Sequence, residues 1–158
     1  MLSDAVAQSF DGFPFEISNP EFGTMYDIFL SFRAPPPPVK SEDINTELRK
    51  AIENSRISVI VFSKTYMTSK ACLFEIKTII EHREANPDHV IVPVYYEVDP
   101  FHIKGQAKRK LEELAKETGE DVEFEGKKVK VEELKKWITA LLKVTHLSGV
   151  VSGDLTQR

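Results

Sequence analysis

Three short apolar runs, with helix-like stretches between them, constrain the fold more than any other feature of this sequence. They cover residues 26–33, 57–62 and 90–96, and they are rich in β-branched and aromatic residues. Runs of this kind are typical of strands that are buried on both faces of a parallel sheet. Because charged amphipathic stretches alternate with them, the sequence predicts β-α-β units. Functional residues are then expected just after the strands, at the carboxyl edge of the sheet.

The stretches between and after these runs predict four helices. Apolar residues recur at helical spacing over residues 41–54, 69–84, 101–118 and 132–143, and Ser41 has the character of an N-cap. Residues 121–131, around Gly126, fit either a hairpin or a solvated loop. Residues 147–151 fit a last short strand.

Length and composition indicate one globular domain. The chain has 158 residues, 41% of them apolar, and a net charge of -4, which gives no general reason to expect nucleic acid as a partner. A single cysteine, Cys72, excludes an intramolecular disulfide framework and fits a reducing compartment. No apolar run approaches the length of a membrane span, and no signal-peptide pattern opens the sequence. We therefore expect a cytoplasmic or nuclear protein without a membrane contact.

Two segments stand apart from this pattern. Residues 1–24 contain four phenylalanines among glycines and prolines, which fits a short helix with an irregular arm, or a disordered leader. The aromatic content favours an arm that packs on something. Residues 35–38 are all proline and favour a stiff linker over a ligand for an aromatic groove. The expected division is an N-terminal arm at 1–24, a domain at 25–152 and a tail at 153–158.

Several motifs together resemble the Toll/interleukin-1 receptor (TIR) domain, in the plant type found in immune receptors. The order and spacing of these motifs make the combination specific over residues 26–150. They are Tyr26-Asp-Ile-Phe-Leu-Ser-Phe-Arg33, residues 52–66, Cys72-Leu-Phe-Glu-Ile76, Val92-Pro-Val-Tyr-Tyr-Glu-Val-Asp-Pro100, Trp137 and Leu147-Ser-Gly149. The resemblance implies an α/β, flavodoxin-like fold with a parallel sheet, reduced here to about four strands.

The sequence also departs from the plant TIR pattern. Residues 34–40 stand where the family has a turn, its first helix, its second strand and a loop that closes over the site, and the last helix is also expected to be missing. The lost strand is an edge, so its loss exposes the first strand. The lost helices cover one sheet face, so this face is expected to be bare. The Phe-rich arm, residues 2–22, or a second chain would then cover it.

The resemblance also implies a site. Enzymatic members of the family hydrolyse the bond between nicotinamide and ribose in NAD+, with a glutamate that corresponds by position to Glu75. A carboxylate there stabilises the oxocarbenium-like ribose, and neither a metal nor a bound cofactor is needed. The residues expected to flank the nucleotide, with NAD+ as a possible substrate, are Phe32, Arg33, Ser69 and Ala71.

Each of these residues also has a plainer interpretation. Glu75 fits a solvated or ion-paired helix glutamate, Arg33 fits a surface arginine that pairs with an acid, and Ala71 stands where the plant pattern has tryptophan. Without the closing loop, an isolated carboxylate gives little catalysis. Cys72 fits packing better than nucleophilic chemistry. The four histidines lack ligand spacing, so no metal site is expected.

Three functions follow, in order of preference. The first is a TIR-domain protein of plant innate immune signalling that acts mainly through protein–protein interaction, with other TIR domains or immune receptors as partners and a homo-oligomer through the bare sheet face. The second is NAD+ hydrolysis using Glu75, so whether the chain is an enzyme stays open. The third is a small flavodoxin-like ligand-binding domain, which is disfavoured because no Gly-rich phosphate loop or acidic pair follows the first strand.

Overall fold

The computed structural model describes residues 6–8, 26–33 and 44–152. The predictions for the rest of the arm, for the proline segment and for Ser41 as an N-cap lie outside these residues. In chain order, the elements are β1 (Val6–Gln8), β2 (Tyr26–Phe32), α1 (Ile44–Glu53), β3 (Ser55–Phe62), η2 (Tyr66–Thr68), α2 (Lys70–Ala85), β4 (Val90–Tyr95), α3 (Pro100–Ala115), β5 (Asp121–Phe124), β6 (Lys127–Lys130), α4 (Val131–Thr145) and β7 (Val150–Val151).

The main sheet is parallel and has the order β1-β2-β3-β4-β7. The flavodoxin-like α/β prediction is confirmed, and its four expected strands are β2, β3, β4 and β7. A fifth strand, β1, pairs with β2 in the register Val6↔Ile28 to Gln8↔Leu30. The prediction that β2 is an exposed edge strand is therefore wrong over these positions, because β1, a part of the N-terminal arm, forms the edge strand there.

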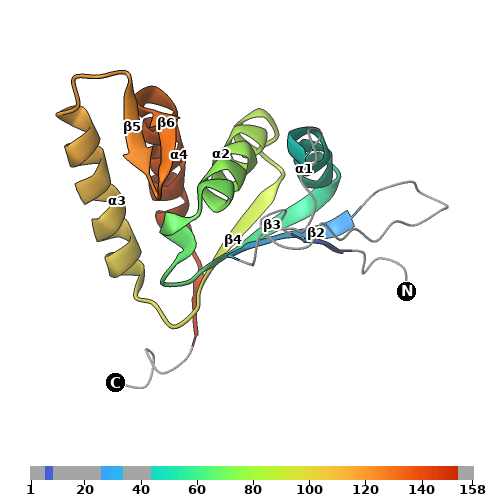
Figure 1. Cartoon of the computed structure of the whole chain (residues 1–158). Coiled ribbons are helices and arrows are strands. Elements are labelled where there is room, and N and C mark those ends of the chain that lie inside the picture. The colour runs from blue at the N-terminus through green and yellow to red at the C-terminus, as the bar shows by residue number, and fades with distance from the viewer. Residues whose placement is uncertain (1–5, 9–25, 34–43, 153–158) are drawn as a thin grey trace.

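All four helices lie on one side of the sheet (Figure 1). From β2 to β3, β4 and β7, every step moves to the next strand in the same direction. Since crossovers between parallel strands are right-handed, each connecting segment returns over the same face. Helices α2 and α4 pack against each other, and α3 packs against α4. No helix in the described ranges is long and apolar enough to cross a membrane.

The core lies between the sheet and these helices. On this face the strands present alternate residues that are almost completely buried, such as Phe29, Ile60, Phe62 and Tyr95. The helices contribute the rest of the core through one apolar stripe each. Ile52 of α1, Leu73, Ile76 and Ile79 of α2, and Leu134, Ile138 and Leu141 of α4 all have 0% exposure.

The other face is much less buried, and we call it the open sheet face. On β2, β3, β4 and β7 the side chains of this face from Ile28 onward are half-buried or exposed, and they are apolar, whereas β1 pairs Gln8 in register with Leu30. In-register pairing places ten of them together: Ile28, Leu30, Phe32, Ile57, Val59, Val61, Val90, Val92, Val94 and Val150. The prediction that the strands are buried on both faces is wrong, because all four helices lie on one side. The expected bare face agrees with this arrangement.

The segment between α3 and α4 is a hairpin, which settles the choice between hairpin and loop. Strands β5 and β6 pair antiparallel from Asp121↔Lys130 to Phe124↔Lys127. The two residues between them, Glu125 and Gly126, have φ of 50° and 80°. Positive φ at both positions is the geometry of a two-residue hairpin turn that matches the strand twist. Phe124 and Val129 are buried beneath the hairpin and join the core.

We expect Gly149→Ala to destabilise the protein by about 2 kcal/mol, because the added methyl has no room. A Cβ at this position would lie 2.5 Å from the backbone oxygen of Pro93 and 2.8 Å from its Cγ. Gly105→Ala in α3 is the matched control. Its Cβ would approach only Arg109 Nη1, at 3.5 Å, so helix propensity should make it neutral or stabilising. Urea unfolding of both variants tests this, and equal stabilities would contradict it.

Candidate functional site

Glu75 lies in the second turn of α2 and is almost completely buried, with 1% exposure. The helix is positioned by Ser69, whose side chain caps it by accepting a hydrogen bond from the Cys72 N–H at 3.0 Å. Cys72, Leu73 and Ile76 hold the same turn in the core. The interpretation of Glu75 as a solvated helix glutamate is therefore excluded, because its carboxyl group faces the sheet.

One side chain from another element bonds to this carboxyl group, and a second side chain bonds to the first. Ser31 of β2, with 0% exposure, donates a hydrogen bond from Oγ to Glu75 Oε1 at 2.7 Å. Tyr66 of η2 lies 2.8 Å from the same Ser31 Oγ through its hydroxyl. Tyr66 also donates to the backbone oxygen of Cys72 at 3.3 Å. The end of β2, the short helix η2 and the start of α2 are thus joined by one buried polar cluster.

The proton positions in this cluster follow from the donors available. A serine hydroxyl has one proton, and here Ser31 gives it to Glu75. Ser31 can then only accept from Tyr66, so the hydroxyl of Tyr66 points its proton towards Ser31 and shares it with the Cys72 carbonyl. Hydrogen bonds to a carboxylate are about twice as strong as neutral ones, and more so in a buried site. The cluster therefore holds the Glu75 side chain in one position.

The other predicted site residues lie at different places around this cluster. Ser69 is 2% exposed and serves as the helix cap, whereas Ala71 and Arg33 are exposed. Phe32 is half-buried and, one residue after Ser31, projects to the opposite side of the sheet, onto the open sheet face. The described geometry thus brings Ser69 near the turn that carries Glu75, and it separates Phe32 from that carboxylate.

Sequence reasoning missed Ser31 and Tyr66. Ser31 gave a signal, since a serine in an otherwise apolar strand is buried with its strand and needs a polar partner. It shares its face of the strand with Phe29, the face that the helices cover. Tyr66 gave a weaker signal, because nothing in a polar loop indicates that a tyrosine turns inward. Its ring packs on Phe62, with the ring centroids 5.0 Å apart.

A second buried polar contact lies at the opposite end of the sheet. His89, with 5% exposure, places Nε2 2.8 Å from Ser58 Oγ, and its ring packs edge-on against His82. Burial is the main cause that lowers the pKa of His89 from 6.5 to about 4, and the charges of His82 and Arg83 add to it, while a hydrogen bond to the backbone of Ser55 opposes it. His89 is therefore neutral at physiological pH.

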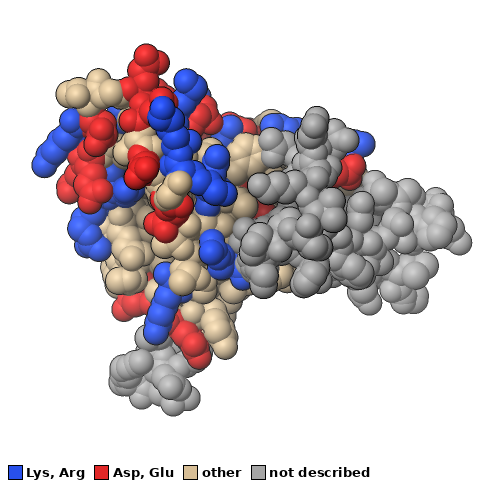
Figure 2. All heavy atoms as spheres, viewed as in Figure 1, with Lys and Arg blue, Asp and Glu red and all other residues tan. Residues whose placement is uncertain are grey.

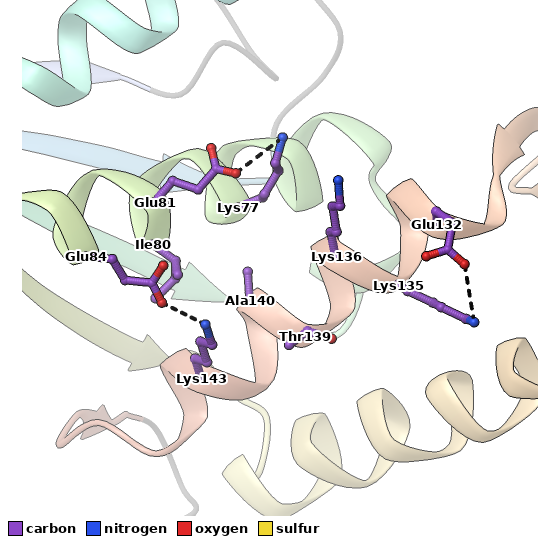
Figure 3. Close-up of a pocket in the computed structure, with 10 residues that line it drawn as sticks. All are labelled: Lys77, Ile80, Glu81, Glu84, Glu132, Lys135, Lys136, Thr139, Ala140 and Lys143. Atoms are coloured by element: carbon purple, nitrogen blue, oxygen red, sulfur yellow. Dashed lines mark hydrogen bonds and ion pairs between the residues drawn. The ribbon is translucent and has the colours of Figure 1, made fainter.

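Neither of two surface hollows among the described residues is lined by Glu75. One, of about 270 Å³, lies between α2 and α4 above Ile80 and Ala140 (Figure 3). Most of its charged residues pair with each other, as Lys143 does with Glu84 at 2.7 Å and Lys77 with Glu81 at 3.6 Å. A smaller one, of about 220 Å³, lies between α1 and α2. Among the described residues, no group of three or more His, Cys, Asp or Glu could hold a metal ion.

The sheet order and the position of Glu75 define a class of protein: a flavodoxin-like α/β domain with a buried carboxylate beside the carboxyl end of β2. The sequence model of the TIR domain family matches residues 38–158. The chain belongs to the TIR domain family.

Its relatives include plant disease resistance proteins. It is 39% identical over 112 residues to disease resistance protein RUN1 of Vitis rotundifolia, an alignment that covers 70% of this chain and 8% of the relative. It is 38% identical over 107 residues to TMV resistance protein N of Nicotiana glutinosa, covering 65% of this chain and 8% of that protein. The chain thus spans less than a tenth of the length of these two curated relatives.

A solved structure with the same fold comes from an assembled receptor. The TIR domains of the activated Roq1 resistosome, which directly recognises the pathogen effector XopQ, match with a TM-score of 0.58 and 29% identity. The match covers 80% of this chain and 87% of the Roq1 chain. TIR domains of a plant resistance protein are therefore found in an oligomeric assembly.

Proposed function

We propose that this chain acts in plant innate immune signal transduction, mainly by binding other proteins. The observation that carries the proposal is the open sheet face, whose ten apolar positions no described helix covers. Exposed apolar patches of this kind mark interaction surfaces in soluble domains. The relatives of the chain support the setting, because their names describe disease resistance proteins.

The partners that we propose are other TIR domains or immune receptors, together with a homo-oligomer through the open sheet face. The presence of TIR domains in the Roq1 resistosome supports association as their mode of action. We place the chain in the cytoplasm or nucleus. Its single cysteine, Cys72, is buried, and a chain with one cysteine cannot form an internal disulfide, which fits a reducing compartment.

NAD+ hydrolysis by Glu75 is the second candidate, with NAD+ as substrate and no bound cofactor. The observation in its favour is the hydrogen bond from Ser31, which fixes the carboxylate as a catalytic group requires. The observation against it is the 1% exposure of Glu75, because a carboxylate that acts on ribose must lie at the surface of a pocket. Binding is therefore preferred over catalysis.

Expression in leaves tests the proposed function. The chain is produced together with a TIR-containing resistance receptor and the effector that activates it, and cell death is measured as ion leakage. We expect the chain to change receptor-triggered leakage, whereas a Val59→Lys variant, which puts a charge in the middle of the open sheet face, should lose this effect. The wild type and the Val59→Lys variant must accumulate to equal levels. If leakage with the wild type were then the same as leakage without it, the result would contradict the proposal.

A further inference from the structure

We propose that the open sheet face is a self-association surface, on which a second copy of this chain stacks its own open sheet face around a two-fold axis. This inference deepens the proposed function and rests on it, because it gives the symmetry and the strength of the homo-oligomer proposed above. It follows from three features of the described residues: the chemistry of the face, the chemistry of the remaining surface and the area available.

The chemistry of the face selects an uncharged partner surface. Its central row joins Leu30, Val59 and Val92 across three neighbouring strands, and the rows on either side are equally apolar. The charged residues of these strands avoid it, since Asp27 and Arg56 belong to the opposite face, where they lie 3.9 Å apart. Any partner that buried charges against this face would leave them without compensation.

The rest of the described surface is charged, so it does not fit against the open sheet face. Figure 2 shows acidic and basic side chains interspersed over the helical part of the molecule. Helices α3 and α4 carry ion pairs on their outer surfaces, such as Lys110–Glu113 and Lys135–Glu132. Among the described surfaces of a second copy, only its own open sheet face is uncharged and can therefore pack on the open sheet face of the first. Contact between identical surfaces generates a closed two-fold dimer, and sheets pack face to face about 10 Å apart at about 30°.

The Phe-rich arm is the competing occupant. Apart from β1, which pairs with β2 at the edge of the sheet, the arm lies outside the described residues. The variants below therefore separate the arm from a second copy.

The area predicts a weak dimer. Strands β2, β3 and β4, about 4.8 Å apart with about six residues of about 3.3 Å each, and the two residues of β7 give a face of roughly 320 Å² per copy. Two copies would bury roughly 640 Å², which is below the 1,200–2,000 Å² or so of stable interfaces. The dimer should therefore form only at micromolar concentrations or above, which suits an association that depends on local enrichment.

Sedimentation velocity from about 10 to 500 µM tests the inference on the full chain. The wild type should move from 18.0 kDa towards twice this mass. Val59→Thr with Val92→Thr keeps the β-branched shapes but adds two hydroxyls to the face, and should raise the dissociation constant at least tenfold with an unchanged circular dichroism spectrum. Val122→Thr is the matched control in the β5–β6 hairpin, where Val122 is half-buried away from the face, and should dimerise as the wild type does.

Other outcomes would overturn the inference. A folded wild type that stays at 18.0 kDa at every concentration rejects the dimer, as does equal association of the Val59→Thr, Val92→Thr variant. If changing Phe10, Phe13, Phe15 and Phe22 to serine turned a monomer into a dimer, the arm would be the occupant instead. A monomeric wild type that still changes receptor-triggered leakage would reject this dimer and leave the proposed function standing.

Discussion

Ser31→Ala should lower the free energy of unfolding by about 3 kcal/mol. The substitution removes the hydroxyl that donates to Glu75 Oε1 at 2.7 Å and leaves the carboxylate in a site with 1% exposure. Loss of a donor to a buried charged group costs about 1.5–3 kcal/mol, and the desolvated carboxylate can raise this cost. The hydroxyl of Tyr66 loses its neighbour at 2.8 Å as well. Urea unfolding of the monomer measures the effect.

A double-mutant cycle separates this contact from general damage to the strand. Glu75→Gln keeps the shape of the side chain but removes its charge, so Ser31→Ala should cost about 1 kcal/mol in that background. The difference of about 2 kcal/mol is the coupling between the two side chains. Equal costs of Ser31→Ala in both backgrounds would show that the hydrogen bond contributes nothing beyond packing.

Acid should destabilise the wild type through His89 by up to about 3 kcal/mol between pH 6.5 and 4. The folded protein holds the pKa of His89 at about 4, below the ordinary value of 6.5, mainly because the ring is buried. Between these two values the unfolded chain binds a proton that the folded chain does not, so stability is complete above about pH 6.5 and falls as the pH is lowered. The shift of about 2.5 units sets the upper limit, at about 1.4 kcal/mol per unit.

His89→Gln is the control for this prediction. Carboxylates also titrate in acid, so the wild type and the variant are compared by urea unfolding at intervals from pH 7 to 4. The variant has no ring to protonate, and its stability should decline less steeply over this range, whatever its stability at pH 7. Parallel curves would contradict the assignment of a neutral, buried His89 in contact with Ser58.

The β-α-β framework could be predicted because its signals are local. Apolar runs identified β2, β3 and β4, and helical spacing identified α2 and α4 to within a few residues. Strand β1 could not be predicted in the same way, because its three residues owe their extended form to pairing with β2. The prediction that the strands are buried on both faces of the sheet was wrong for a related reason. Apolar strands indicate that partners exist, but the direction of the crossovers decides which side of the sheet the helices cover.

The candidate site was predictable only in part. The resemblance to the family pointed to Glu75, and helical spacing predicted the helix that carries it, whereas the role of Ser69 as the N-cap was not predicted. The surroundings of Glu75 depend on tertiary contacts with residues 9 and 44 positions away in the chain, Tyr66 and Ser31, and no local pattern contains them. Burial of the carboxylate, which favours binding over catalysis, was therefore visible only in the folded chain.

The most direct test of a binding function, as opposed to a catalytic one, is nicotinamide release from NAD+. Wild type and Glu75→Gln are compared at about 100 µM protein, where the proposed dimer should be populated. Since Glu75 is buried and bound to Ser31, we expect both proteins to release nicotinamide at the same background rate. Release by the wild type that disappears in Glu75→Gln, with both proteins folded, would contradict this account and establish Glu75 as a catalytic residue.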